Sequence, residues 1–205
     1  MSAAPTIALV RHASTAWSGK RYAGRSDPSL DRAGEAAAAE LARHLVGVIG
    51  PEGRIVSSPL RRAVATAMAS AVSTGAPITL DGRWVEADVG SVEGLTFLDI
   101  AERWPDLARR LADGETDIDW PDGETATAFD DRVRAAWAAL ADDDRPTVVV
   151  AHAGPLRLVL AVAAGRQPHD LWLPEPASIV WVPAPVRPVP NDQPAPDGPR
   201  ATLGR

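Results

Sequence analysis

The sequence contains no cysteine and only one lysine, Lys20, among its 205 residues. Without cysteine the chain has no disulfide, no thiolate nucleophile and no cysteine-ligated zinc site. Its 21 cationic side chains are outnumbered by 27 acidic ones, which gives a net charge of -6. Because no dense block of lysine and arginine is present, a groove for nucleic acid is disfavoured. We therefore expect a small-molecule partner and no nucleic acid.

Long apolar runs are also missing. No uninterrupted apolar stretch reaches about 18 residues, the length that a membrane-spanning helix requires. Residues 1–5 lack the basic segment and the long apolar segment of a secretory signal. No Gly-x-Gly-x-x-Gly follows the first apolar run, which disfavours a dinucleotide-binding fold. These absences predict a cytoplasmic protein that does not interact with membranes.

Two apolar runs of strand length each end in a histidine. Residues 7–10 are followed by Arg11 and His12, and residues 147–151 are followed by His152. In open α/β sheets the ligand crevice lies just beyond the carboxyl ends of the strands. The chain has only four histidines, so two of them at the ends of its two strongest strand candidates predict a shared functional site.

Strand patterns alternate with helix patterns along the rest of the chain. Further strands are expected at 54–57, 77–80 and 179–182. Helices are expected at 32–48, 59–73, 96–103, from 105 onward, 125–141 and 155–164. Ser58 followed by Pro59 predicts a capped start for the second of these helices. The alternation predicts an α/β fold with a parallel or mixed sheet covered on both faces.

Four segments lack a regular period. Residues 13–30 are rich in turn formers and are expected to lie over the crevice, while residues 83–96 read as a long irregular loop that carries function. The acidic stretch 113–124 is expected to be a solvated connection, and residues 142–144 a solvated turn rather than a metal site.

The composition changes after Val182, because seven of the last 23 residues are proline. We expect one domain over residues 1–183 and a proline-rich, disordered tail over residues 184–205. A proline-motif ligand for a partner is the alternative interpretation of this tail.

Arginines accompany the histidines. Arg11 precedes His12, and Arg61 and Arg62 fall in the first turn of the 59–73 helix, where a cation opposes the helix dipole. An arginine in that position indicates a functional role, because the same helix end attracts anions. The guanidinium fork matches phosphate, and nearby positive charge keeps an imidazole neutral and nucleophilic. Phosphoryl transfer to a histidine follows from this combination.

A carboxylic acid completes the set. Glu86 lies in the irregular loop expected over the crevice, where its proton can be given to a departing alkoxide. As a carboxylate it can then activate a water molecule. Arg11, His12, Arg62, Glu86 and His152 are therefore the candidate catalytic residues.

These residues lie in motifs that resemble those of the histidine phosphatase superfamily, which contains cofactor-dependent phosphoglycerate mutases and α-ribazole phosphatases. The resemblance covers residues 6–182. Arg11-His12-Ala13 stands where the family has Arg-His-Gly. Residues 58–67 match its Ser-x-Leu-x-Arg-Ala-x-x-Thr-Ala pattern, and this register selects Arg62 over Arg61. Glu86 opens a stretch similar to the family's acid loop.

The resemblance implies a three-layer αβα sandwich with a mostly parallel central sheet. It also implies a phosphohistidine on His12, Glu86 as proton donor, and phosphoryl oxygens held by Arg11, Arg62 and His152, with no metal and no other cofactor. The implied substrate-binding residues are Arg11, Thr15, Ser18, Arg21, Ala23, Gly24, Arg62, Ala153 and Gly154.

The expected activity is hydrolysis of a small phosphorylated metabolite, a phosphomonoester. A phosphoglycerate mutase-type phosphotransferase is the alternative, although the acid loop lacks the mutase-like Glu-Arg-His-Tyr-Gly. A non-catalytic binding module of the same fold is disfavoured because all five candidate residues are present. Residues 121–125, Pro-Asp-Gly-Glu-Thr, are similar to the Pro-Gly-Gly-Glu-Ser of α-ribazole phosphatase-like members. The sequence leaves the physiological substrate and the choice between monomer and dimer open.

Overall fold

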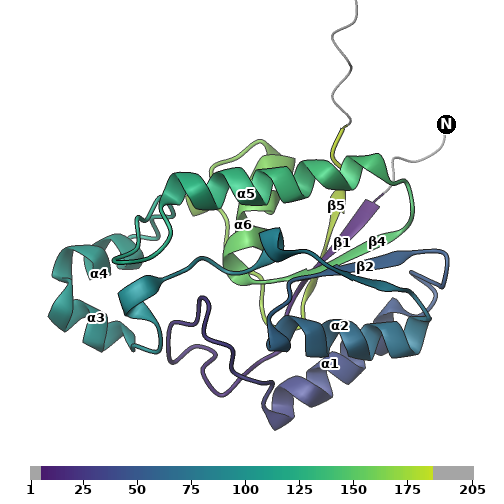
Figure 1. Ribbon diagram of the computed structural model, residues 1–205, viewed down its shortest axis with the longest axis horizontal. Coiled ribbons are helices and arrows are strands. Elements are labelled where there is room, and N and C mark those ends of the chain that lie inside the picture. Colours follow the sequence, from purple (N-terminus) through teal and green to yellow (C-terminus); the bar gives the residue numbers. More distant parts are fainter. Residues whose placement is uncertain (1–5, 187–205) are drawn as a thin grey trace, which may run out of the picture.

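A computed structural model describes residues 6–186 of the chain. In this part, one mixed sheet has the strand order β3-β2-β4-β1-β5 (Figure 1). The strands are β1 (Thr6–Arg11), β2 (Arg54–Ser57), β3 (Ile78–Leu80), β4 (Thr147–Ala151) and β5 (Ile179–Pro183). The first four pair in parallel, and β5 pairs antiparallel with β1. The expectation of a mostly parallel sheet is confirmed.

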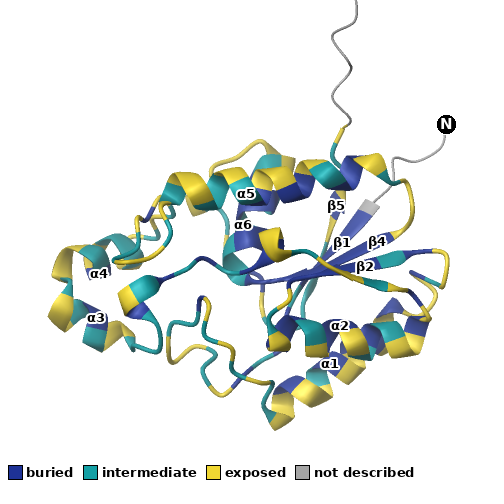
Figure 2. Cartoon of the chain, in the orientation of Figure 1, coloured by how far each residue is buried: buried dark blue, intermediate teal, exposed yellow. Residues whose placement is uncertain are grey.

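Helices cover both faces of the sheet. α1 (Arg32–Leu45) and α2 (Arg61–Thr74) lie on one face, and α5 (Ala126–Ala138) and α6 (Ala153–Ala164) on the other (Figure 1). Because successive side chains of a strand point to opposite faces, Ile7 and Leu9 of β1 join the core cluster with Val133 and Leu156. Ala8 and Val10 join the other core cluster, with residues of α1 and α2. The expected three-layer αβα sandwich is thus confirmed, with β1, β2 and β4 buried between the helices and the edge strands β3 and β5 more exposed (Figure 2).

Two short helices form a small cap beyond the sheet. α3 (Phe97–Arg103) and α4 (Pro105–Ala112) lie apart from the layers in Figure 1 and pack on a third, smaller core cluster. The expected capping box at the start of α3 is present, with Thr96 and Asp99 bonding each other's backbone N–H. Phe97 of α3 and Leu111 of α4 line the cavity that is described below.

The start of α2 differs from expectation. The helix begins at Arg61, and Ser58 does not cap it. Asp27, from the loop after β1, accepts the hydrogen bond of the Arg61 N–H at 2.8 Å. Ser58 instead lies 2.7 Å from His152 Nε2, because a fully buried imidazole needs a polar partner.

The predicted boundary at residue 183 stays a prediction. Most of the proline-rich tail, residues 187–205, lies outside the described residues. Ala184 still packs against the core beside α6, directly after β5. Among the helices of residues 6–186, none is long and apolar enough to cross a membrane.

Candidate active site

The two histidines meet at the carboxyl edge of the sheet. β1 and β4 run in parallel register with Arg11 opposite Ala151, so the next residue of each strand is a histidine at the same edge. The ring centroids of His12 and His152 are 5.0 Å apart. His12, together with Arg11, Arg62 and Glu86, lines a cavity of about 840 Å³, and the fully buried His152 lies behind it. The structure therefore brings all five candidate catalytic residues together.

His12 presents one ring nitrogen to the cavity. Its Nδ1 lies 2.7 Å from the carbonyl oxygen of Ala13. Since a carbonyl oxygen only accepts, Nδ1 carries the hydrogen and Nε2 keeps its lone pair. Burial, and to a smaller extent the charges of Arg62 and Arg11, lower the pKa of His12 to about 3 despite the opposing bond to Ala13. The imidazole is therefore neutral at physiological pH, with the lone pair of Nε2 free.

His152 has the opposite arrangement. Its Nε2 bonds the hydroxyl of Ser58, and its Nδ1 is buried with no hydrogen-bond partner. The Ser58 hydroxyl oxygen also accepts the Leu60 N–H at 3.3 Å. Burial, followed by the positive fields around it, lowers the pKa of His152 well below its ordinary value. Sequence reasoning did not find Ser58 as the partner of His152, although Ser58 opens the motif that contains Arg62.

The two arginines reach the cavity from different elements. Arg11 Nη1 donates to the carbonyl of Pro174 at 2.7 Å, while its Nε is buried without a partner. Arg62 is 1% exposed, and its guanidinium donates to the carbonyls of Ala23, Gly24 and Ser26. Arg62 thus also anchors the loop that follows β1. Burial lowers the pKa of both guanidinium groups, and the carboxylate of Glu86 opposes that shift.

Glu86 lies against the start of α6. Its carboxylate accepts the N–H of Gly154 at 3.2 Å and that of Ala87 at 3.0 Å. A Cβ atom at Gly154 would lie 2.4 Å from Glu86 Oε1, so a side chain there would displace the carboxylate from this position. These bonds hold the carboxylate in the wall of the cavity that His12 also lines.

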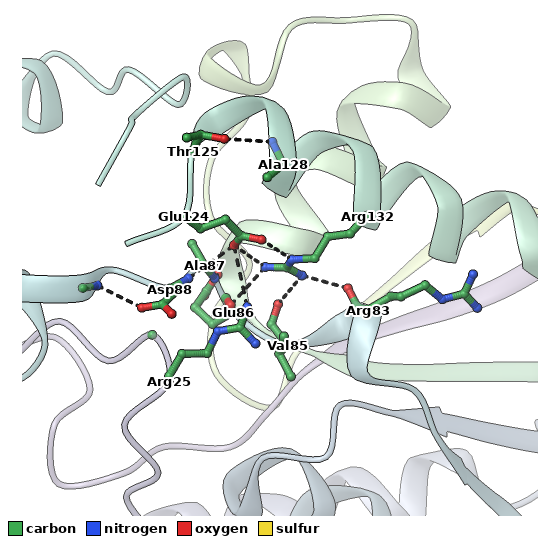
Figure 3. Close-up of polar contacts among 12 residues, drawn as sticks. Arg25, Arg83, Val85, Glu86, Ala87, Asp88, Glu124, Thr125, Ala128 and Arg132 are labelled. Atoms are coloured by element: carbon green, nitrogen blue, oxygen red, sulfur yellow. Dashed lines mark hydrogen bonds and ion pairs between the residues drawn. The ribbon is translucent and has the colours of Figure 1, made fainter. Parts of the chain in front are cut away.

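A partly buried ion pair holds the backbone that carries Glu86 (Figure 3). Arg132 of α5 bonds the carboxylate of Glu124 through Nε at 2.6 Å and through Nη2 at 2.8 Å. Its remaining N–H groups donate to three backbone carbonyls of the loop over residues 83–96, those of Arg83, Val85 and Glu86, at 2.8 to 3.1 Å. All five N–H donors of this guanidinium are therefore used.

Glu124 bonds the same loop from the other side. Its backbone N–H donates to the carbonyl of Asp88, and its carboxylate accepts the Asp88 N–H. Burial raises its pKa, but the bonds from Arg132 outweigh burial and hold the pKa below its ordinary value. Most of residues 113–124 is exposed or half-exposed, as expected of a solvated connection. Glu124, with its side chain 11% exposed, is an exception, and Ile118 is another. The similarity of residues 121–125, Pro-Asp-Gly-Glu-Thr, to a family motif was the one sequence signal that could have singled out Glu124. No sequence pattern indicated Arg132.

The expected substrate-binding residues form the rim and walls of the cavity, with one exception. Of the expected residues, those that line the cavity are Arg11, Thr15, Ser18, Arg21, Ala23, Arg62, Ala153 and Gly154. Ser18 Oγ accepts the Thr15 N–H at 2.9 Å, which closes the turn after the first histidine. Arg21 donates to the carbonyl of Gly94 at 2.6 Å and so ties this loop to the acid loop.

Gly24 does not line the cavity but is buried behind it. A Cβ atom there would lie 2.1 Å from the carbonyl oxygen of Ala87. The loop after β1 and the acid loop therefore pack too closely for a side chain, and Gly24 serves that packing. Glu93 reinforces the contact by accepting the N–H groups of Gly24 and Arg25.

No group of three or more metal-binding side chains occurs within residues 6–186. Asp143, in the acidic turn considered at 142–144, pairs with Arg54 at 3.1 Å and with Arg145 at 2.6 Å. Chemistry without a metal stays a prediction.

Comparison with protein families gives one match over nearly the whole described chain. The family model described as histidine phosphatase superfamily (branch 1) matches residues 7–183.

Individual relatives carry different names. A bifunctional protein of Mycobacterium tuberculosis is 36% identical over 167 residues, which are 77% of this chain and 43% of that protein. The chain thus spans less than half the length of this relative. A probable phosphoglycerate mutase of Citrobacter koseri is 35% identical over 149 residues, 70% of this chain and 67% of that protein. The structure of mycobacterial glucosyl-3-phosphoglycerate phosphatase with VO3 is similar at a TM-score of 0.78, with 28% identity, over 87% of this chain and 90% of that one.

Proposed function

This chain belongs to the histidine phosphatase superfamily, and on that basis we propose that it hydrolyses a phosphomonoester of a small molecule through a phosphohistidine on His12. The mycobacterial protein of similar structure is named as a phosphatase, which supports hydrolysis. The whole cycle is proposed to use only side chains of this chain, with no metal and no other cofactor.

One observation carries the proposal. Four buried side-chain N or O atoms of the described residues have no hydrogen-bond partner, and two of them, Arg11 Nε and His152 Nδ1, belong to the candidate site. Leaving a buried N–H unpaired costs about 1 to 3 kcal/mol, so such groups call for an explanation. The Ser58 hydroxyl has no other acceptor among the described residues, which assigns its hydrogen to His152 Nε2 and the ring hydrogen to Nδ1. Both unpaired atoms are then donors, as an anion requires.

The first step transfers the phosphoryl group to the enzyme. The lone pair of His12 Nε2 attacks phosphorus, the N–P bond forms, and the bond between phosphorus and the ester oxygen breaks. Arg11 and Arg62 neutralise the charge on the other phosphoryl oxygens, and the Nδ1–H of the neutral His152 donates a hydrogen bond to them, where electrostatic stabilisation acts. Glu86 enters this step as the protonated carboxylic acid and gives its proton to the departing alcohol oxygen.

The second step regenerates the enzyme. Glu86, now a carboxylate, takes a proton from a water molecule whose oxygen attacks phosphorus. The N–P bond breaks, inorganic phosphate leaves, and His12 and Glu86 return to their starting protonation states. Because both steps use the same carboxylate, its position next to the leaving oxygen decides the rate of both.

The experiment that tests this proposal traps the intermediate. Base quench during turnover of a labelled phosphomonoester should leave label on the protein that is stable in base and lost in acid, as expected for a phosphoramidate. His12→Ala should abolish the label. His44→Ala is the matched control, because His44 is exposed on α1, and it should label normally. Equal labelling of His12→Ala and wild type would overturn the proposal.

The mutase alternative is supported by the name of the Citrobacter relative. It is tested by supplying 3-phosphoglycerate with and without 2,3-bisphosphoglycerate. A phosphatase releases inorganic phosphate, whereas a mutase forms 2-phosphoglycerate with little phosphate release. Predominant formation of 2-phosphoglycerate would favour the mutase.

A further inference from the structure

Aromatic residues are scarce in this chain and concentrated in one place. The sequence has seven tryptophans, two phenylalanines and one tyrosine. Half of these ten line the active-site cavity: Trp17, Tyr22, Phe97, Trp120 and Phe129. With the neighbouring Leu111, Ile118, Leu158 and Leu173, which also line the cavity, they form what we call the apolar wall. Such concentration in a cavity indicates contact with an apolar ligand.

The apolar wall is assembled from distant segments. Trp17 and Tyr22 come from the loop after β1, Phe97 from the start of α3, and Phe129 from α5. The rings of Tyr22 and Trp120 lie 6.1 Å apart at 58°, within the range of a favourable aromatic pair. Phe97 remains 42% exposed and Leu173 45% exposed. Large apolar side chains left open to solvent around a cavity mark a binding surface.

The apolar wall begins where the leaving group would emerge. A Cβ atom at Gly154 would lie 2.4 Å from Glu86 Oε1 and 3.1 Å from Phe129 Cζ. The proton donor and the edge of the Phe129 ring therefore approach the same point. An ester oxygen next to Glu86 places the carbon atoms attached to it against Phe129.

The arginines that line the cavity outside the catalytic set already form hydrogen bonds or ion pairs within the protein. Arg21 donates to the carbonyl of Gly94 and Arg157 to that of Pro168, each at 2.6 Å. Arg134 pairs with Asp130 on the same helix. Three acidic residues line the same region, Glu115, Asp117 and Asp130. Glu115 and Asp117 pair with Arg110, and Asp130 neutralises Arg134, whereas Arg21 and Arg157 bond only neutral carbonyls. The three lining carboxylates oppose a second anion, and the apolar wall is what favours an uncharged ligand.

We propose that the alcohol part of the substrate is an uncharged, largely apolar group, at least as large as a hexyl chain or a phenyl ring, that lies along the apolar wall. This inference rests on the proposed function, and it separates the chain from relatives named for phosphoglycerates, which carry a carboxylate. The cavity, about 840 Å³, is of the size that holds a ligand much larger than a phosphate group.

The test is a series of primary alkyl phosphates, from ethyl through butyl and hexyl to octyl, with 3-phenylpropyl phosphate as the aromatic member. Their leaving alkoxides are chemically alike, so differences in kcat/KM report contact of the chain with the protein. Burial of one methylene corresponds to about a fourfold gain. We expect kcat/KM to rise about two- to fourfold per methylene up to hexyl, and to exceed that for glycerol 3-phosphate and 3-phosphoglycerate.

Variants locate the effect. Trp120→Ala should lower the hexyl-to-ethyl ratio of kcat/KM about tenfold or more, and Phe97→Ala, at an exposed position, should lower it in the same direction. The ratio is measured on one sample, so it does not depend on how much of a variant folds. Trp181→Ala is the matched control, because Trp181 lies on β5 and does not line the cavity, and it should leave the ratio unchanged.

The outcomes separate the two proposals. A flat alkyl series, a preference for 3-phosphoglycerate, or a ratio that both wall variants leave unchanged would overturn the apolar substrate while hydrolysis through His12 stands. Failure to hydrolyse any of these esters, together with no labelling of His12, would overturn the proposed function itself.

Discussion

Glu124→Gln tests whether the ion pair with Arg132 positions the proton donor. The side chains are 11% and 17% exposed, so Arg132 would lose the counterion of a nearly buried charge. Breaking such a pair costs about 3 to 5 kcal/mol. Because glutamine keeps one oxygen that can accept one of the two bonds, we expect a loss of about 2 to 3 kcal/mol in the free energy of unfolding. For a chain of this size that corresponds to a fall in Tm of about 4 to 12 °C.

Catalysis should respond in a way that lost stability alone does not explain. Arg132 bonds the carbonyl of Glu86 itself, so a loosened guanidinium lets the proton donor drift from the leaving oxygen. A misplacement of about 1 Å can cost about 100-fold. We expect phosphorylation of His12 by an alkyl phosphate to slow about 10- to 100-fold. Phosphorylation by 4-nitrophenyl phosphate should change much less, because a stabilised phenolate leaves without a proton.

The assay is single-turnover phosphorylation of His12 with each ester, measured well below the Tm of the variant. This step is measured alone because hydrolysis of the intermediate is also proposed to use Glu86. Asp106→Asn is the matched control: it breaks an ion pair with Arg109 whose side chains are 91% and 69% exposed, and such pairs contribute about 0 to 1 kcal/mol. Equal slowing for both esters, or no slowing despite a lower Tm, would refute a positioning role for Glu124.

Four further predictions follow from the site and the sequence. Because the pKa of His12 is about 3 in the folded chain against an ordinary 6.5, the unfolded chain gains a proton that the folded one does not as pH falls from 6.5 to 3. The free energy of unfolding of the protein should therefore decrease, as pH falls through that window, by up to about 1.4 kcal/mol per pH unit. When it is measured by urea unfolding, the free energy of His12→Asn should depend less steeply on pH. Ser58→Ala leaves both ring nitrogens of His152 without a partner and should slow phosphorylation of His12 about tenfold while costing about 1 to 2 kcal/mol, and unchanged kinetics would contradict the hydrogen assignment. EDTA should leave turnover unchanged, whereas loss of activity restored by added magnesium or zinc would refute metal-free catalysis. Truncation after Val186 should change Tm and kcat little, and a large fall in either would show that the tail contributes to the domain.

The elements and the two histidines were predictable from sequence because their signals are local. A run of β-branched residues ending in a polar group identifies both the strand and the crevice edge, and this held for residues 147–151 and His152. Arg62, Glu86 and His12 followed from motifs with fixed spacing. The structure places these residues around one cavity, while their proposed roles wait for the experiments above.

Contacts between segments far apart in the chain were not predictable. Asp27 caps α2 from 34 residues away, and Arg132 donates to carbonyls about 47 residues away. A backbone carbonyl is present in every residue, so an arginine that binds several of them leaves no recognisable pattern. The exception at Glu124 has the same origin, because nothing in an acidic, turn-rich stretch shows which carboxylate pairs with an arginine on another element.

The place of β1 in the sheet has a consequence for synthesis of the protein. β1 is made first, yet its neighbours on both sides are β4 and β5, the last two strands. During translation it therefore waits with both edges unpaired while more than a hundred residues emerge, and unpaired apolar strands are aggregation-prone. The contacts that complete the sheet are long-range in sequence and form slowly. A nascent chain should stay inactive until β4 has emerged and paired beside β1, because only then does the second histidine reach the first.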